Sequence, residues 1–437
     1  MDSYKILLIA RYEGKLLCRN FVFLLLCGFM LLGIVVFHVF LQSDWRVFEY
    51  SVNLPSGMPY ANAYLWGIMQ SFLVIFVVGD FVYRDNIEKT NDVFLARDFS
   101  NLEYLTGKLV GVVVVFLVLN VISMFICMLV HLFASSFRFN VGLYLFYLLT
   151  VSLPALLFMS GLVFMIKIWI KFRFFALTGL VMFLFLSLFV FSTKTLGIFD
   201  FMASRVPHIF SSMVGHPAMG SYLLHRLVFV LVGVGCFVIS VYGFKRLPNN
   251  TGRSRRLGVV GVVFVLLGFL TGWLYWLPHQ VARETRNDWV TIQKKYDAYP
   301  KVKIEQHEIK YDIRGEKILA RSVISVRNSN LFRVDSVIFY LNPSLEVTGV
   351  TAGSHNVNFT RNQQIVVIEK SLHPDERCEL DLSYSGAIDP RICYLDISPE
   401  RYDEQEQDEL FACYGKRFVF TGKDFTLLTP EALWYPV

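Results

Sequence analysis

Two short stretches of this chain hold residue types that could do chemistry, and neither has the required spacing. His307-Glu308 could open an H-E-x-x-H motif, in which two histidines on one helix face bind zinc and the glutamate activates water. Ile309, Lys310 and Tyr311 follow, so the second histidine is absent, and the alternation of apolar residues predicts a strand. A zinc peptidase active site is therefore not expected.

Gly107-Lys108 could close a phosphate-binding loop, G-x-x-x-x-G-K-[ST]. Leu102 stands where the first glycine belongs and Leu109 where the hydroxyl residue belongs, so ATP hydrolysis by this route is excluded. His208 and His216 have no acidic residues at ligand spacing, and such histidines are more often ordinary interface residues. We predict no catalytic, cofactor-binding or metal-binding residue in this chain.

The stretch 84–108 suits contact with another protein better than catalysis. Arg84 and Glu88 form an opposite-charge pair at helical spacing. Ser100 to Glu103 fits the capping box S-x-x-E, so a helix should begin near Ser100 and continue into the next apolar run. The segment is either a docking site that passes a displacement to that helix or an ordinary solvated loop, and its residues alone weigh these two hypotheses about equally.

The elements that carry these residues are mostly apolar. The chain has 437 residues, of which 55% are hydrophobic and 16% aromatic. About 20 apolar residues cross a bilayer core, and seven runs are long enough. We expect membrane helices near 20–42, 61–83, 107–133, 141–166, 172–193, 222–244 and 257–277.

Lysine and arginine predict the orientation, because short cytoplasmic loops are rich in them. One set of loops holds sixteen of these residues and the opposite set five, Arg226 being counted among the five. The N-terminus is therefore expected in the cytoplasm and everything after about residue 280 outside. The net charge of +6 then reflects topology, and no nucleic-acid partner is expected.

Residues 1–20 and the loop 194–222 should lie at opposite membrane surfaces. The first combines apolar and basic residues, which predicts either an interfacial helix on the inner leaflet or a simple extension of the first span. The second groups Gly, Pro and apolar residues, which suits short helices dipping back into the outer membrane half. Its candidate residues are Pro207, His216 and Pro217.

Few polar residues are expected inside the spans. Asn120 should bond to a neighbouring helix, and Pro154 should produce a kink. No charged residue lies at the centre of a predicted span, which disfavours an ion-coupled transporter, since such proteins usually keep ionisable groups there.

From about residue 300, apolar and polar residues alternate with a period of two. Strands are expected at Lys303–Ile313, Ser322–Val326, Val334–Leu341, Ile365–Ile368 and Cys378–Tyr384. We predict an all-β extracytoplasmic domain over 301–437, joined to the seventh helix by a linker helix over 283–300. Of the seven cysteines, three (Cys378, Cys393 and Cys413) fall in this domain, so at most one internal disulfide could form there.

The charged segment resembles the cytoplasmic loop of type-2 ABC transporter permeases (ABC-2 type). The matching residues are Arg84-Asp85, Thr90, Asp92, Leu95 and Glu103-Tyr104-Leu105-Thr106-Gly107-Lys108; Lys89 stands where the family has glycine, and no proline lies near Asp98. The interfacial helix, the six spans of 21–245 and the outer re-entrant segment extend the resemblance.

That resemblance implies a permease dimer, formed with a second copy or a paralogue, with each half bound to a separate nucleotide-binding subunit that hydrolyses ATP. The contact residues it implies are Arg84, Asp85, Glu88, Asp92, Arg97, Glu103, Tyr104 and Lys108. The location it implies is the bacterial cytoplasmic (inner) membrane, in a multi-pass arrangement within the lipid bilayer.

The β domain resembles the N-terminal domain of M1-family zinc aminopeptidases. Leu380 to Ile388 is close to the family pattern L-x-L-x-Y-x-G-x-I, and Leu427 to Pro436 resembles the passage into the catalytic domain. The catalytic zinc domain itself is missing. The alternative function is therefore a membrane-anchored peptide-binding or aminopeptidase-accessory protein, with an M1 catalytic domain supplied in trans.

Overall fold

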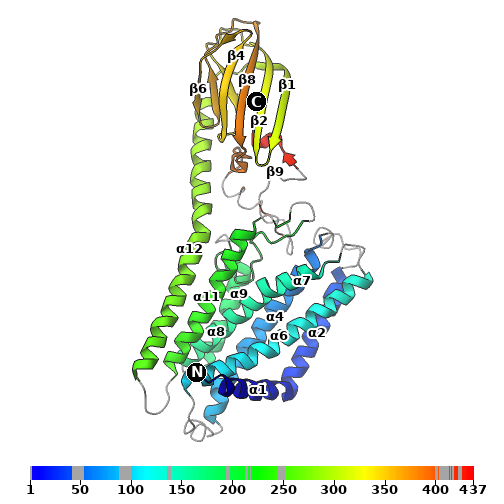
Figure 1. Cartoon of the computed structure of the whole chain (residues 1–437), viewed down its shortest axis with the longest axis vertical. Coiled ribbons are helices and arrows are strands. Elements are labelled where there is room, and N and C mark those ends of the chain that lie inside the picture. Colours follow the sequence, from blue (N-terminus) through cyan, green and yellow to red (C-terminus); the bar gives the residue numbers. More distant parts are fainter. Residues whose placement is uncertain are drawn as a thin grey trace. The chain divides into compact units, whose positions relative to one another are not determined.

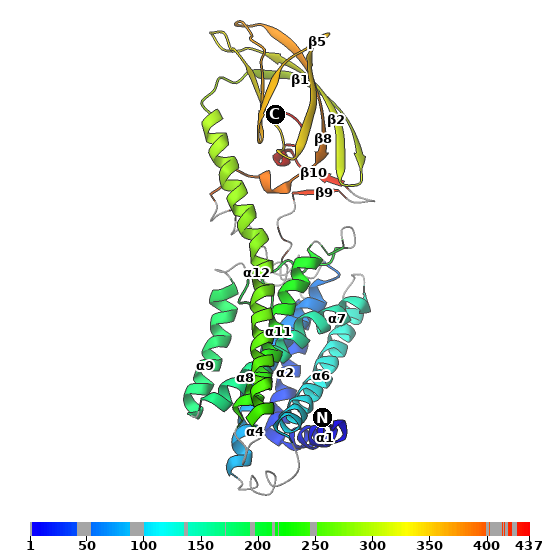
Figure 2. The same cartoon turned by 60° about the vertical axis from the view of Figure 1, so that its left-hand side comes forward.

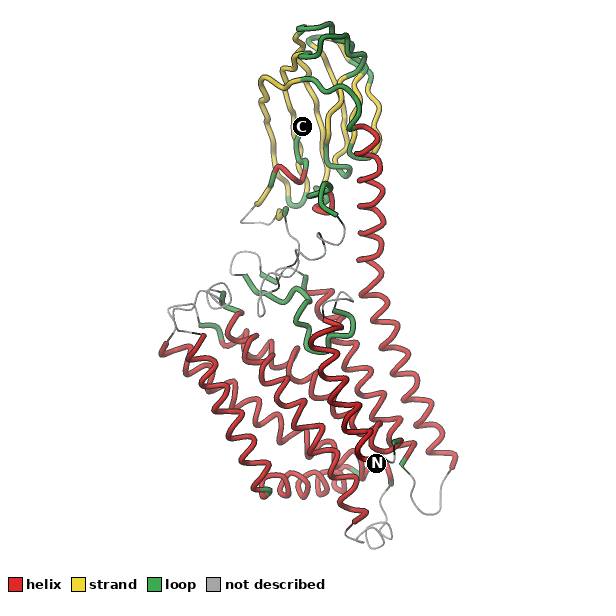
Figure 3. Tube along the Cα trace, turned by 180° about the vertical axis from the view of Figure 1, so that it is seen from behind, coloured by secondary structure: helices red, strands yellow, loops and turns green. Residues whose placement is uncertain are grey.

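A computed structural model describes most of the chain, which forms two compact units. The described residues are 2–41, 54–87, 100–134, 139–170, 172–192, 197–211, 215–216, 218–244, 251–398, 402, 413, 415, 418–421 and 426–437. The first unit, here the helical unit, is Met1–Leu277 with Gln407–Gly415, and the second, the β unit, is Pro278–Glu406 with Lys416–Val437. Figure 3 shows the change from helix to strand along the chain.

Among the described residues, seven helices are long and apolar enough to cross a membrane. Their segments are α2 (Phe21–Leu41), α4 (Gly57–Ile87), α6 (Asn101–Ala134), α7 (Val141–Tyr147) continuing through the π turn η2 (Leu148–Ser152) into α8 (Leu153–Trp169), α9 (Arg173–Leu186) continuing into η3 (Ser187–Phe191), α11 (Met219–Gly243) and α12 (Thr251–Tyr296). In the helical unit these helices run alongside one another (Figure 1).

Residues 3–19 form a helix of their own, α1 (Ser3–Arg19), which lies across one end of the bundle (Figure 1). Asp2 caps its start by accepting a hydrogen bond from the Tyr4 amide at 3.0 Å. Asn20 adopts an extended conformation at its end and separates it from α2. The segment is therefore a separate helix and not an extension of the first span, and its place at the membrane surface stays a prediction.

Glycines bring α8, α11 and α12 into backbone contact. A Cβ at Gly161 of α8 would collide with the backbone of Gly233 on α11, and a Cβ at Gly235 would lie 2.9 Å from the Gly261 carbonyl oxygen of α12. Small residues permit this approach between apolar helices, where dispersion and backbone contacts drive association. The helix α11 is thus fixed on two sides.

The seventh apolar run and the expected linker helix are one element. Helix α12 continues from Thr251 to Tyr296 with Pro278 inside it, whereas separate segments were expected at 257–277 and 283–300. The division between the two units falls at this proline. Apolar periodicity stops at about residue 277, but helical hydrogen bonding does not depend on hydrophobicity, so the helix extends beyond the apolar run.

The β unit contains antiparallel sheets. The five-stranded sheet has the order β1 (Lys303–Arg314), β2 (Lys317–Arg327), β8 (Arg377–Ala387), β4 (Leu345–Ala352), β5 (His355–Asn356); a three-stranded sheet has β3 (Val337–Tyr340), β7 (Ile365–Ile368), β6 (Phe359–Asn362); a two-stranded sheet pairs β9 (Val419–Thr421) with β10 (Thr426–Leu428). Alternate residues of β2 are buried, which confirms the period-two pattern. Figure 2 shows β1, β2 and β8 of the five-stranded sheet side by side.

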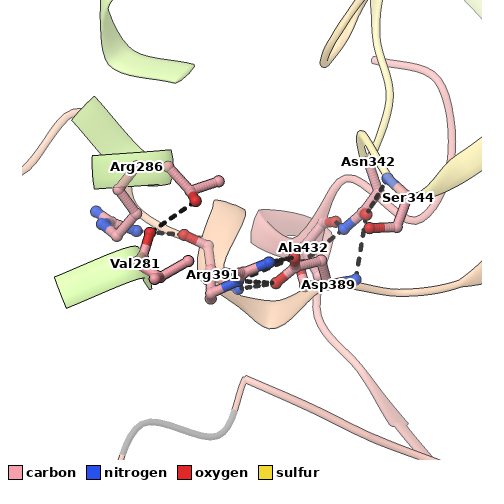
Figure 4. Close-up of polar contacts among 8 residues, drawn as sticks. Val281, Arg286, Asn342, Ser344, Asp389, Arg391 and Ala432 are labelled. Atoms are coloured by element: carbon pink, nitrogen blue, oxygen red, sulfur yellow. Dashed lines mark hydrogen bonds and ion pairs between the residues drawn. The ribbon is translucent and has the colours of Figure 1, made fainter. Parts of the chain in front are cut away.

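A buried arginine helps to hold the part of α12 that belongs to the β unit. Arg286 donates hydrogen bonds from Nη1 to the carbonyl oxygens of Arg391 (2.6 Å) and Cys393 (2.7 Å), and from Nη2 to that of Tyr394 (3.0 Å). Close by, Asn342 donates to the carbonyl oxygens of Asp389 and Ala432 (Figure 4). These bonds satisfy loop carbonyls that no strand pairs.

Replacing Arg286 by alanine should loosen the loop around Cys393. Hydrogen bonds from a charged donor each contribute about 1.5–3 kcal/mol, and roughly 1.4 kcal/mol is a factor of ten in an opening equilibrium. Burial raises the pKa of the Cys393 thiol to about 12, so the native thiol reacts slowly. We expect a thiol reagent to label Cys393 roughly tenfold faster or more in Arg286→Ala, in a chain where Cys393 is the only cysteine left.

Arg283 is the matched control, because it lies on the same helix and is exposed. Arg283→Ala should leave the labelling rate unchanged. Equal rates for the two alanine variants would contradict the anchoring role of Arg286.

Candidate functional site

At the end of the bundle where α1 lies, α1 packs against the beginning of α6. A Cβ at Gly107 would lie 2.7 Å from the Ile9 Cβ, and a Cβ at Gly111 would lie 2.7 Å from the Ala10 carbonyl oxygen. The two glycines therefore permit an approach that no larger residue allows. Gly107, which the sequence suggested as part of a failed phosphate loop, has a packing role.

A buried ion pair joins the same two helices. Lys108 Nζ lies 2.8 Å from Glu13 Oε1, and the two side chains are only 3% and 4% exposed. The ammonium group also lies over the Tyr104 ring, 5.1 Å from its centroid. Because a charge away from water needs a partner, this pair sets the register of α1 on α6.

Glu103 completes the junction and confirms the expected capping box. Its amide donates to Ser100 Oγ (3.2 Å), and its Oε2 accepts from the Ser100 amide (3.0 Å). Its other oxygen, Oε1, accepts from the Asp2 amide at 2.7 Å, next to the start of α1. One carboxylate thus serves the N-terminal ends of two helices.

The start of α6 is also joined to the end of α11. Asn101 Nδ2 donates to the Phe244 carbonyl oxygen at 2.9 Å, and the Tyr104 ring stacks on the Phe244 ring at 5.8 Å. Three of the predicted docking residues, Glu103, Tyr104 and Lys108, therefore belong to a junction of α1, α6 and α11.

The other predicted docking residues are not brought into this junction by any described contact. Arg84 and Asp85 lie in the last turn of α4, and their side chains are outside the described part of the structure. Glu88, Asp92 and Arg97 lie wholly outside the described residues. Docking at this segment stays a prediction.

At the opposite end of the bundle, residues 197–211 form turns rather than the expected short helices. Asp200 organises them: its carboxylate accepts hydrogen bonds from the Met202 amide (2.9 Å), the Ser204 amide (2.5 Å) and Ser204 Oγ (2.6 Å). Burial raises the pKa of this carboxyl, and these bonds and the charge of Arg226 oppose the rise. A side chain that captures nearby amides favours a turn over a helix.

The predicted residues of this outer segment lie in separate surroundings. Pro207 is close to Gly415, whose added Cβ would lie 2.8 Å from the proline Cγ. The His216 ring packs against the rings of Phe146, Phe210 and Tyr222. Pro217 lies outside the described residues. Within the described part of the chain, no group of three potential metal ligands occurs.

The residue that sequence reasoning misplaced is Arg226. It was counted as a loop charge, but it lies in α11 and is only 3% exposed. Its Nε donates to the Thr150 carbonyl oxygen at 2.6 Å and its Nη2 to the Val151 carbonyl oxygen at 3.4 Å. The predicted span 222–244 already included Arg226, so the sequence held the signal that this arginine belongs to a helix. Arg226 lies near the beginning of α11 and not at its centre.

Amide and hydroxyl side chains form bonds between the helices. Asn120 Nδ2 donates to Gln70 Oε1 at 2.7 Å, which confirms the expected bond to a neighbouring helix. Gln70 Nε2 in turn donates to the Ser152 carbonyl oxygen at 2.9 Å. The π turn η2, which Pro154 follows, thus receives donors from α4 as well as from α11.

Comparisons with known proteins match a small part of the chain. No family model matches, and no curated protein does. Two solved structures of an M1 zinc metallopeptidase mutant from Deinococcus radiodurans, one of them bound to a Tyr-Ser-Ala substrate, have identities of 15% and 14% and TM-scores of 0.19. The match covers 20% of this chain and about a fifth (21%) of those structures.

Breaking the Glu13–Lys108 pair on one side should destabilise the helical unit. Lys108→Met leaves a buried carboxylate without its partner, which costs about 3–5 kcal/mol, whereas Glu13→Leu with Lys108→Met should be close to neutral. Thermal unfolding of the detergent-purified chain measures both.

Lys15→Met is the matched control, because Lys15 is an exposed lysine of α1. Its unfolding temperature should equal that of the unchanged chain. A double variant as unstable as Lys108→Met would contradict this expectation. It would show that the attraction between Glu13 and Lys108 exceeds the free-energy cost of burying the two charges.

Proposed function

We propose that this chain is the membrane-spanning permease subunit of an ATP-driven ABC-2 type transporter. The observation that carries the proposal is the junction of α1, α6 and α11 at the start of α6, where the segment 84–106 ends, on which a nucleotide-binding subunit would dock. The seven apolar helices supply the membrane-crossing part.

The distribution of basic residues supports the orientation. With sixteen of the loop lysines and arginines on one side, that side faces the cytoplasm, so the α1 end and the docking segment meet a cytoplasmic ATPase. The β unit is then extracytoplasmic, and the location is the bacterial inner membrane. The bilayer, a second permease copy or paralogue and the ATPase are the proposed partners.

The contacts suggest how a displacement of the docking segment would be transmitted through the bundle. A displacement of the docking segment moves the start of α6, and α1 moves with it because Glu103 and the Glu13–Lys108 pair join the two helices. Asn101 and Tyr104 connect the same point to the end of α11. Movement of these three helices would reorient the bundle around a transported substrate.

The chain purified with its nucleotide-binding subunit should show substrate-stimulated ATP hydrolysis. Reversing a charge at a docking surface weakens binding by several kcal/mol, so Glu88→Arg should abolish most of the stimulation. Glu316→Arg reverses an exposed charge in the β unit and should leave it intact.

Glu103→Arg should also abolish the stimulation, but it removes the helix cap at the same time, so Glu88→Arg is the cleaner test. Stimulation that survives both reversals argues against docking on 84–106. Uptake by the isolated chain in ATP-free vesicles that follows a proton gradient would favour an ion-coupled transporter instead.

The alternative of a peptide-binding or aminopeptidase-accessory protein gains little from the residues that suggested it. Leu380, Leu382 and Tyr384 of β8 are buried in the core of the β unit. Alternating burial on a central strand accounts for the pattern L-x-L-x-Y without a binding site. A catalytic M1 domain that co-purifies with the chain would revive this alternative.

A further inference from the structure

The fourth apolar helix is interrupted where a proline leaves a carbonyl group without its usual donor. Helix α7 ends at Tyr147, the π turn η2 occupies Leu148–Ser152, and Pro154 is the second residue of α8. In a regular α-helix the amide of residue 154 would donate to the Thr150 carbonyl oxygen. Proline has no amide hydrogen, and in apolar surroundings the carbonyl needs a donor from elsewhere.

Helix α11 supplies that donor. Arg226 Nε lies 2.6 Å from the Thr150 carbonyl oxygen, the same atom that residue 154 would serve. Its Nη2 reaches the next carbonyl, that of Val151, at 3.4 Å. One turn earlier on the same face of α11, the Tyr222 hydroxyl lies 2.9 Å from Thr150 Oγ1.

We propose that Arg226 replaces the amide hydrogen that Pro154 lacks, and that this bond is a releasable latch on a hinge between α7 and α8. On the C-terminal side of the hinge, α8 is fixed to α11 by the backbone contact of Gly161 with Gly233. On the N-terminal side, side chains join α7 and η2 to α11. Among these side chains, Arg226 donates to main-chain carbonyl oxygens of η2. The half that can move is therefore α7.

Three features allow the latch to open. Arg226 Nη1 is buried and has no hydrogen-bond partner among the described residues, so the guanidinium is not fully satisfied where it lies. The buried carboxylate of Asp200 attracts it electrostatically, although the two form no ion pair in this structure, and offers a second acceptor. A π turn beside a proline is also a common place for a helix to bend.

A double-mutant cycle tests the replacement. Arg226→Ala should lower the thermal unfolding temperature of the detergent-purified chain by several degrees. Pro154→Ala restores an amide that can bond to the Thr150 carbonyl. In that background, Arg226→Ala should lower the unfolding temperature by less than half as many degrees. Equal losses in both backgrounds would overturn the proposal. Arg226→Met, which keeps the packing volume, serves if the alanine variant does not fold.

Gln70→Ala is the matched control. Gln70 also donates to a carbonyl of this break, that of Ser152, but the regular donor for that carbonyl is the amide of residue 156, which is present. Pro154→Ala should therefore rescue Arg226→Ala and not Gln70→Ala. Equal rescue of both would mean that alanine merely straightens the helix, and would refute the specific replacement.

Spin labels on either side of the hinge test the latch itself. Leu145 of α7 and Trp169 of α8 are 46% and 57% exposed, and helical rise puts them roughly 36 Å apart. Arg226→Ala should broaden their distance distribution, and Pro154→Ala should narrow it again. Arg226→Lys keeps the charge but loses the second bond, the one to the Val151 carbonyl oxygen. Its distance distribution should broaden less than that of Arg226→Ala. An unchanged distribution in Arg226→Ala would refute the hinge.

Opening of the latch during transport rests on the proposed function. With the nucleotide-binding subunit and ATP present, the distance between the labels should shift. If the mutant cycle holds and ATP leaves the distance unchanged, the latch is static and its release is refuted. The permease proposal is judged separately by the ATPase measurement.

Discussion

Satisfying backbone carbonyls and amides in apolar surroundings is the constraint on which the helical unit depends. Where helices are regular, hydrogen bonding along the chain meets it. Where they are interrupted, a side chain must supply the partner, because an unsatisfied backbone group in such surroundings costs several kcal/mol. Arg226 does so at the Thr150 carbonyl, and Asp200 does so at the amides of Met202 and Ser204.

Side chains that replace main-chain hydrogen-bond partners are therefore charged or polar residues at positions where composition alone would not predict them. A buried arginine in an apolar helix is costly unless it has acceptors, and two main-chain carbonyls provide them. The Glu13–Lys108 pair follows the same logic at the other end of the bundle. Both of these polar groups therefore lie where a helix interruption or a helix junction needs them.

Helix α11 connects these places. Residues near its beginning hold the break in the fourth apolar helix, its glycines contact α8 and α12 by backbone, and Phe244 at its end meets the start of α6. Close backbone contact leaves little room for sliding, so a displacement at one end of α11 has a direct mechanical route to the other. The β unit is organised differently, by strand pairing and by Arg286 beneath its loops.

Local features of this chain could be predicted from the sequence because they depend on neighbours in the sequence. The seven apolar helices, the capping box at Ser100–Glu103 and the alternation of β2 and β8 are of this kind. The strand β4 was not predicted, since a bulge between Val347 and Gly349 breaks its period-two pattern. The very short strands β5 and β6 were not predicted either. Only the tertiary structure decided that Arg226 serves a carbonyl far along the chain and that Lys108 meets Glu13. The physical reason is that a buried charge takes whichever partner the packing brings near, and sequence spacing does not encode that distance.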